Sequence, residues 1–146
     1  TVSGGAAIDD ADMIAVVAAF DAANTPMEMR RGVIGSGTKG DLLNVNKYVA
    51  YDQTGKTGKA VDGSGGLIAN VYGMDIYMSQ NVPISTTGRN LFFHKNAINL
   101  AKQQAPKFEA EYSVDYLGWK TALHTIYGVG VERANSMVQV TRTTAA

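Results

Sequence analysis

The sequence predicts a mixed α+β fold, in which helical and strand-forming segments follow one another without a fixed repeat. Three features carry this prediction. Apolar residues recur at helical spacing from Met13 to Phe20, β-branched and aromatic residues dominate from Leu67 to Met78, and glycine clusters separate such segments. The chain has 146 residues, of which 45% are apolar and 18% charged, so it is long enough for one globular domain with its own core.

The first helix is expected to begin at the acidic residues of Asp9–Asp12. Carboxylates at this position accept hydrogen bonds from the free backbone N–H groups of a helix start. The apolar residues of Met13–Phe20 then lie on one helical face. The helix should end near Asn24, because Pro26 disfavours helical geometry in the residue before it.

A short strand is predicted at Arg30–Ile34, and the glycines of Gly35–Gly37 are expected to end it in a turn or loop. The segment Thr54–Gly66 contains five glycines, whose ordering is entropically costly. It is expected to be a mobile surface loop.

Two antiparallel strands, Ile68–Tyr72 and Met74–Met78, are predicted around Gly73. A second helix is predicted at Asn96–Gln104, where three apolar residues share a face and Pro106 limits the extension.

The alternating segment Phe108–Val114 predicts another strand. Apolar residues at helical spacing in Trp119–Ile126 predict a helix after Asp115. The chain should close with strands at Val129–Val131 and Met137–Thr141 around a turn at Ala134–Ser136, and the last residues, Thr143–Ala146, should fray.

Charge and composition exclude some classes of function. Thirteen basic residues balance thirteen acidic ones, so no long-range field attracts nucleic acid or anionic lipid. The longest mostly apolar run, Met13–Phe20, is far shorter than the ~20 residues of a membrane span. The chain has no cysteine, and therefore no disulfide framework or thiolate metal site.

The segment Ala50–Thr57 comes closest to an enzyme motif, since it resembles a phosphate-binding loop with alanine in place of the first glycine. Such a loop needs a helix directly after it, and the glycine-rich Gly58–Gly66 is a poor helix start. A solvated loop is therefore the favoured interpretation. The segment Gly35–Gly40 lacks the Gly-Lys-Ser/Thr ending and is interpreted as a tight turn.

No catalytic, cofactor-binding or metal-binding residue is assigned. His94 and His124 have no second ligand at helical spacing; His94 is interpreted as a cap or an exposed residue and His124 as a hydrogen-bonded structural residue. The acidic residues of Asp9–Asp12 are explained by the helix start. Trp119 and the three tyrosines between positions 112 and 127 could stack on single-stranded nucleic acid, but core or interface packing is the commoner use.

Several phrases resemble the major capsid proteins of tailed bacteriophages, which share a fold with herpesvirus shells and encapsulins. The phrases are LFFHKNAINLAKQ and EAEYSVDYLGWKTALHTIYGVGVERANSMVQV in the second half, and IAVVAAFDAANTPMEMRRGVIG and LIANVYGMDIYMSQNVP in the first. Their order and spacing carry the resemblance more than any single motif. Val131–Ala134 departs from the Leu-Arg-Pro that relatives often carry there.

The resemblance implies a capsid protein fold with the axial domain and part of the peripheral domain. Residues 1–106 would be mostly axial, and residues 107–146 would return to the peripheral domain. Family members are about twice this length, so the part that carries the N-terminal arm, extended loop and spine helix is expected to precede Thr1.

The implied function is that of a non-enzymatic shell subunit, which assembles in the host cytoplasm into pentamers and hexamers of the virion capsid. It would contact packaged DNA without sequence specificity, bind no cofactor or membrane, and meet scaffolding, portal or decoration proteins. An encapsulin-like bacterial compartment is the alternative within this fold. A nucleotide-binding enzyme or a small ligand-binding module are the alternatives outside it.

Overall fold

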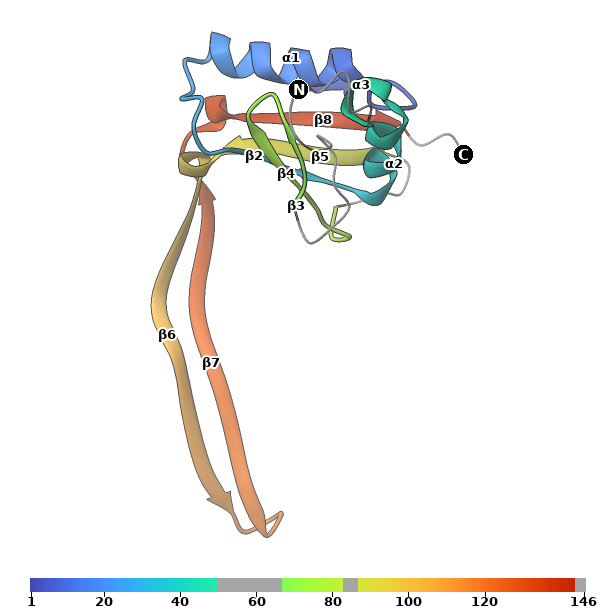
Figure 1. The fold of residues 1–146 in the computed structure, drawn as a ribbon. Coiled ribbons are helices and arrows are strands. Elements are labelled where there is room, and N and C mark those ends of the chain that lie inside the picture. Colours follow the sequence, from blue (N-terminus) through green and yellow to red (C-terminus); the bar gives the residue numbers. More distant parts are fainter. Residues whose placement is uncertain (50–66, 83–86, 144–146) are drawn as a thin grey trace. The chain divides into compact units, whose positions relative to one another are not determined.

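The structure is a computed structural model that describes residues 1–49, 67–82 and 87–143. The chain divides into two compact units, one formed by Thr1–Ala97 with Arg133–Ala146 and the other by Ile98–Glu132. We call them the sheet unit and the hairpin unit. The predicted α+β class is confirmed, since the sheet unit combines helices with a six-stranded sheet (Figure 1).

The sheet unit contains all the described α-helices. Its elements are β1 (Val2–Gly4), α1 (Asp10–Ala22), β2 (Arg30–Ile34), α2 (Ser36–Asn44), α3 (Asn46–Val49), β3 (Leu67–Val71), β4 (Met74–Met78), β5 (Thr87–His94) and β8 (Met137–Thr143), with 3-10 turns at Lys95–Ala97 and Ala134–Ser136. The strand order is β1-β8-β5-β2-β4-β3. The pairs β1–β8 and β2–β4 are parallel, and the other neighbours are antiparallel.

The helix start predicted at Asp9–Asp12 is confirmed. The Asp9 carboxylate accepts from the Asp12 backbone N–H at 3.1 Å, and the Asp12 carboxylate accepts from the Asp9 N–H at 3.2 Å. This reciprocal capping box satisfies two donors that a helix start leaves free. The helix ends at Ala22, two residues before the predicted position, and it lies along β8 (Figure 1).

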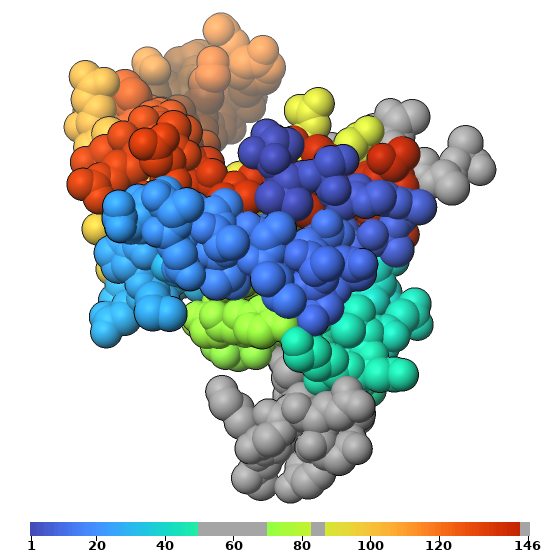
Figure 2. Space-filling model, turned by 90° about the horizontal axis from the view of Figure 1, so that it is seen from above, coloured from blue at the N-terminus to red at the C-terminus, as the bar shows by residue number. Residues whose placement is uncertain are grey.

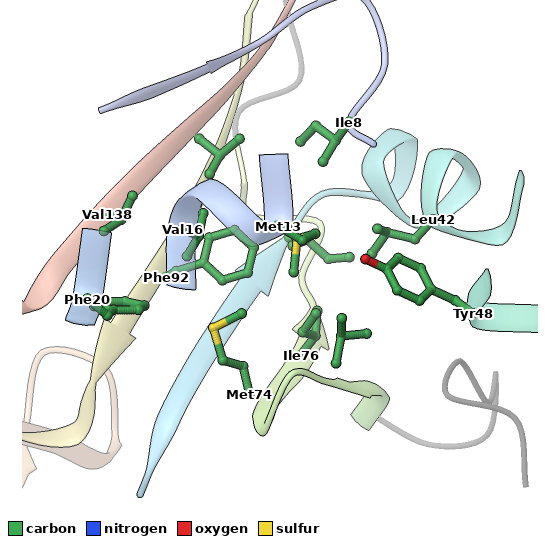
Figure 3. Packing of buried hydrophobic residues seen from close by; sticks show 13 residues of the cluster. Ile8, Met13, Val16, Phe20, Leu42, Tyr48, Met74, Ile76, Phe92 and Val138 are labelled. Atoms are coloured by element: carbon green, nitrogen blue, oxygen red, sulfur yellow. The ribbon is translucent and has the colours of Figure 1, made fainter. Parts of the chain in front are cut away.

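The core lies between α1 and the sheet, and Phe92 of β5 is at its centre. Phe92 is opposite Gly32 of β2, and a Cβ atom at position 32 would lie 2.6 Å from the ring. Glycine is therefore required there by packing. The fully buried members of this cluster come from both layers (Figure 3): Ile8, Met13, Val16, Phe20, Ile34, Leu42, Met74, Ile76, Phe92 and Val140.

The turn predicted at Gly35–Gly37 and the tight turn expected over Gly35–Gly40 are both wrong, because α2 begins at Ser36 and runs to Asn44. Asn90, which is fully buried on β5, supplies the missing cap: its side-chain oxygen accepts from the Gly35 N–H at 3.0 Å and from the Thr38 hydroxyl at 3.1 Å. Its amide donates to the Val140 carbonyl at 3.4 Å. This contact spans more than fifty residues of sequence and outweighs the poor helix propensity of the two glycines.

The strand predicted at Arg30–Ile34 is confirmed as β2. The predicted antiparallel pair around Gly73 is confirmed as β3 and β4, with Gly73 at the positive φ of 76° that favours glycine. The loop expected at Thr54–Gly66, the phosphate-loop candidate Ala50–Thr57 and the last three residues lie outside the described residues.

Two predicted helices are wrong. The first, Asn96–Gln104, starts in the 3-10 turn Lys95–Ala97 and continues as β6 (Ile98–Ser113), and the second, around Trp119–Ile126, lies in β7 (Gly118–Val131). The two strands pair along their length as the hairpin unit. The strands predicted near Phe108, at Val129–Val131 and at Met137–Thr141 are confirmed, as is the turn at Ala134–Ser136.

The chain leaves the sheet unit after Ala97 and re-enters it at Arg133. The domain division expected between residues 106 and 107 therefore falls inside β6, and β8 pairs with β1 and β5 of the sheet unit. The assignment of these units to axial and peripheral domains stays a prediction.

Replacing Asn90 with alanine is expected to lower the free energy of unfolding by about 1–3 kcal/mol, because the Gly35 N–H and the Thr38 hydroxyl lose their buried acceptor. Chemical denaturation followed by circular dichroism measures this change. The exposed Gln80→Ala serves as a control that should change stability by less than about 0.5 kcal/mol. Equal stabilities of the two variants would show that Asn90 does not hold the start of α2.

Candidate functional site

The hairpin unit separates apolar from polar side chains by strand alternation. Directly paired residues project to the same side of a hairpin, and the pairs Tyr112–Trp119, Phe108–Leu123 and Leu100–Val129 share one side. We call this side the apolar hairpin face. Its members are Ile98, Leu100, Lys102, Phe108, Ala110 and Tyr112 of β6 and Trp119, Thr121, Leu123, Thr125, Tyr127, Val129 and Val131 of β7, so Lys102 is its one charged residue.

The opposite side, the polar hairpin face, carries most of the charged residues. Glu111 pairs with Lys120, Glu109 with Ala122 and Lys107 with His124. The Lys107 ammonium also contacts the Glu109 carboxylate at 2.6 Å along the strand, with both side chains more than half exposed. The hairpin is therefore an amphipathic two-stranded sheet.

Two irregularities in the pairing of β6 leave the apolar side chains before and after them on the same face of the hairpin. The register shifts by one residue between Lys102 and Gln104, and by one more between Gln104 and Lys107. One extra residue would turn every later side chain to the opposite face, whereas two restore the original alternation. Leu100 and Phe108 therefore face the same side, and Pro106, which cannot donate to a strand ladder, lies within the irregular stretch.

The apolar hairpin face has no core to cover it within the described chain. Trp119 is 72% exposed, Leu123 73% and Phe108 66%, and none of residues 98–132 is buried. Trp119 packs edge-on against Tyr112, with ring centroids 5.7 Å apart. A two-stranded hairpin is marginally stable in water, and burying each large apolar side chain contributes roughly 1.5–3 kcal/mol. We therefore take this face as the candidate functional surface.

The turn at the tip of the hairpin also exposes apolar side chains. Val114, Tyr116 and Leu117 in the turn are 74%, 80% and 79% exposed. Contiguous apolar patches of this kind mark contact surfaces in soluble proteins. Of the uses weighed for Trp119 and the neighbouring tyrosines, core packing does not occur within the described chain; packing at an interface and stacking on single-stranded nucleic acid both fit exposed rings.

The two histidines occupy different surroundings. His94 is buried, and its Nδ1 accepts from the Asn96 N–H at 3.2 Å, so of the two interpretations of this residue the structure selects the cap. His124 is exposed on the polar hairpin face, with its Nε2 3.5 Å from the Gln104 side-chain amide nitrogen, and its interpretation as a hydrogen-bonded structural residue stays a prediction. Within the described residues no three histidines or carboxylates are grouped as metal ligands.

A polar cluster joins α1, α3 and the β3–β4 turn. The Asp10 carboxylate accepts from Lys47 Nζ at 2.9 Å, from the Tyr72 hydroxyl at 2.7 Å and from the Tyr48 hydroxyl. Burial raises the Asp10 pKa, but the hydrogen bonds from Tyr48, Tyr72 and Lys47 together lower it below the ordinary value. Burial and the bond to Asp10 raise the Tyr48 pKa. These groups are paired with one another, which is typical of a structural cluster.

The start of α2 borders a small hollow of about 160 Å³ lined by Gly35–Thr38, Gly88, Asn90 and Arg142. Its polar groups are already engaged, since Asn90 caps the helix and the Arg142 guanidinium pairs with the Asp41 carboxylate at 2.5 and 3.2 Å. Pockets for small ligands are about 300–1,000 Å³, so this hollow supports no ligand site.

Comparison with solved structures identifies the fold. A structure from Mycobacterium phage Che8 matches 95% of this chain and 52% of its own, with 23% identity and a TM-score of 0.73. The capsid of bacteriophage PhiM1 matches 94% of this chain and 50% of its own, with 15% identity and a TM-score of 0.69. The capsid of cyanophage P-SCSP1u matches 95% of this chain and 52% of its own, with 20% identity and a TM-score of 0.64.

The predicted fold is thereby confirmed: this chain has the fold of phage capsid proteins. It spans about half the length of the solved chains that it matches. No protein-family model matches the chain, and neither does any curated protein sequence. None of the helices in residues 1–49, 67–82 and 87–143 has the length and apolarity needed to cross a membrane.

The exposure of Trp119 can be measured directly, because it is the only tryptophan in the chain. In the isolated 146-residue chain at low concentration, its fluorescence is expected to be quenched by acrylamide almost as strongly as that of a free tryptophan derivative, since 72% of the side chain is exposed. The denatured chain provides the reference. Strong protection relative to the denatured chain would show that the apolar hairpin face is already covered.

Proposed function

We propose that this chain is part of a structural subunit of a tailed-phage capsid, in which copies of the protein bind one another to form a closed icosahedral shell. The observation that carries the proposal is the match of its fold, over 95% of the chain, to phage structures that include two capsids. The uncovered apolar hairpin face supports it, since a shell subunit must bury such surfaces against neighbouring protein.

In this proposal the two units have different places in the shell. The sheet unit forms most of the axial domain, around the fivefold and sixfold positions, and the hairpin unit belongs to the peripheral domain. The reason lies in the hairpin's architecture: a long two-stranded sheet with one apolar face needs a further layer to become a stable domain. In the assembled shell, the rest of the full-length subunit or a neighbouring copy supplies that layer across the apolar hairpin face.

Shell function of this kind depends on binding and involves no reacting group. Subunits bind through contacts between unlike surfaces, and these contacts close into rings and then into a sphere. Many modest interfaces together then supply the binding free energy that holds the shell. A contact of ordinary size, about 1,600 Å² in total, is sufficient when each subunit makes several. With 13 basic and 13 acidic residues, the chain would contact packaged DNA weakly and without sequence specificity.

Electron microscopy of the full-length protein tests the proposal. Expression with any scaffolding partner encoded beside it, followed by negative staining, is expected to give uniform icosahedral particles. Particles with tails or enclosed DNA identify a phage shell, and particles filled with protein cargo identify an encapsulin-like compartment. Monomers alone, at high concentration and with the scaffolding partner present, would contradict a shell function.

Leu123→Lys is expected to reduce the yield of particles about tenfold or more, because it places a charge in the middle of a surface that must become buried. Ala122→Lys is the matched control. It adds the same side chain at the neighbouring position, which projects to the polar hairpin face. Sedimentation of the expressed protein measures both yields. Equal losses for the two variants would show that the apolar hairpin face is not the surface that assembly buries.

A further inference from the structure

The chain leaves and re-enters the sheet unit at two points that are hydrogen-bonded to each other. The hairpin unit, Ile98–Glu132, lies between Ala97 and Arg133. The Arg133 N–H donates to the Ala97 carbonyl at 3.4 Å. Both partners of this bond belong to the sheet unit, so the sheet unit itself closes the opening from which the hairpin unit extends.

The turns on both sides of this bond are anchored in the sheet unit. Before the bond, Ala97 is fully buried, and the His94 Nδ1 accepts from the Asn96 N–H at 3.2 Å. After the bond, the hydroxyl of the buried Ser136 accepts from the Thr25 hydroxyl at 3.3 Å. None of these contacts involves a residue of the hairpin unit, so they hold the junction closed without it.

The core of the sheet unit is also built without the hairpin unit. The buried cluster of the described residues extends from Ile8 to Val140 and contains no residue between 98 and 132. Figure 2 shows α1, in blue, packed against the orange-red residues around the start of β8. The elements that enclose this core therefore come from the two stretches of chain on either side of the hairpin unit.

The hairpin unit depends on contacts of a different kind. None of residues 98–132 is buried, and the ring contact of Tyr112 with Trp119 joins side chains that are 50% and 72% exposed. Backbone pairing and contacts on the surface are what hold its two strands together. Segments with few buried apolar contacts open locally at a far lower free energy than a core does. The hairpin is therefore expected to open and close while the sheet unit stays folded.

We propose that the hairpin unit orders separately from the sheet unit: it is marginally folded in the free chain and becomes stably ordered when assembly covers the apolar hairpin face. Covering removes the aligned apolar side chains from water only in the paired form, so it shifts the equilibrium of the hairpin toward that form. In the open form these side chains are not aligned on one face, so free subunits present less contiguous apolar surface. The coupling to assembly rests on the proposed function, whereas the separate ordering rests on the fold alone.

Hydrogen exchange followed by mass spectrometry tests the separate ordering in the 146-residue chain at low concentration. After correction for intrinsic rates, the amides of β6 and β7 are expected to exchange about a hundredfold faster than those of β5 and β8. The core strands of the same chain serve as the internal control. Equal protection of the hairpin and the core strands would overturn the separate ordering.

The same measurement on particles of the full-length protein tests the coupling. Relative to the free chain, exchange of the hairpin amides should slow by about a hundredfold, while that of β5 and β8 should change little. Fast exchange of the hairpin in intact particles would overturn the coupling. A full-length protein that forms no particles would contradict the shell function and the coupling together, and the free chain would still decide the separate ordering.

Removal of the hairpin provides a second measurement of the separate ordering. An N–H that bonds to a carbonyl three residues earlier closes a β-turn, so the existing bond between Arg133 and Ala97 fits a linker of two residues. Replacing Ile98–Glu132 with the dipeptide Asn-Gly is expected to leave a cooperative unfolding transition, with a urea midpoint within about 0.3 M of that of the 146-residue chain.

Val138→Ala, in the core, shows that this transition reports the sheet unit. It should lower the midpoint by the same amount with and without the hairpin, because changes in uncoupled units are additive. Loss of the cooperative transition in the shortened chain, or a markedly larger effect of Val138→Ala in it, would overturn the separate ordering.

Discussion

The packing of Phe92 against Gly32 is the constraint on which the sheet unit depends. It lies where the central strands β5 and β2 pair, and a Cβ atom at position 32 would come within 2.6 Å of the ring. With the ring seated in this space, Met13, Val16 and Phe20 of α1 close over it. The hydrophobic free energy of this unit is therefore concentrated on one side of the sheet. The other side is left with partly exposed apolar residues and two arginines.

The hairpin unit depends on a different constraint, the alignment of its apolar side chains on one face. It has no buried residue of its own, so its sequence must keep the apolar side chains in line along two long strands until another layer covers them. The two single-residue shifts in β6 preserve this alignment together, because either shift alone would move Phe108 and Tyr112 to the side opposite Leu100. The irregular stretch around Pro106 also makes β6 a poor template for pairing with a further strand.

Local signals predicted the elements whose structure is determined locally. The capping residues of Asp9–Asp12 and the glycine turn at Gly73 act within a few residues, and both were predicted. The start of α2 could not be predicted from local sequence, because the residue that caps it, Asn90, is more than fifty residues away. The segment Asn96–Gln104 contains good helix formers, and from Ile98 onward it is a strand because it pairs with β7. In β7 a signal was present: Trp119, Thr121 and Leu123 alternate with period two, and this competed with the helical spacing that was preferred.

The candidate surface was also only partly predictable. Sequence indicated that Trp119 and its neighbouring tyrosines would serve packing, but exposure distinguishes a core from an interface, and exposure depends on tertiary structure. The apolar hairpin face carries Lys102 as its one charged residue, so its burial supplies affinity with little directional preference. The charge pairs of the hairpin, such as Glu111 with Lys120, lie on the opposite face of the same two strands.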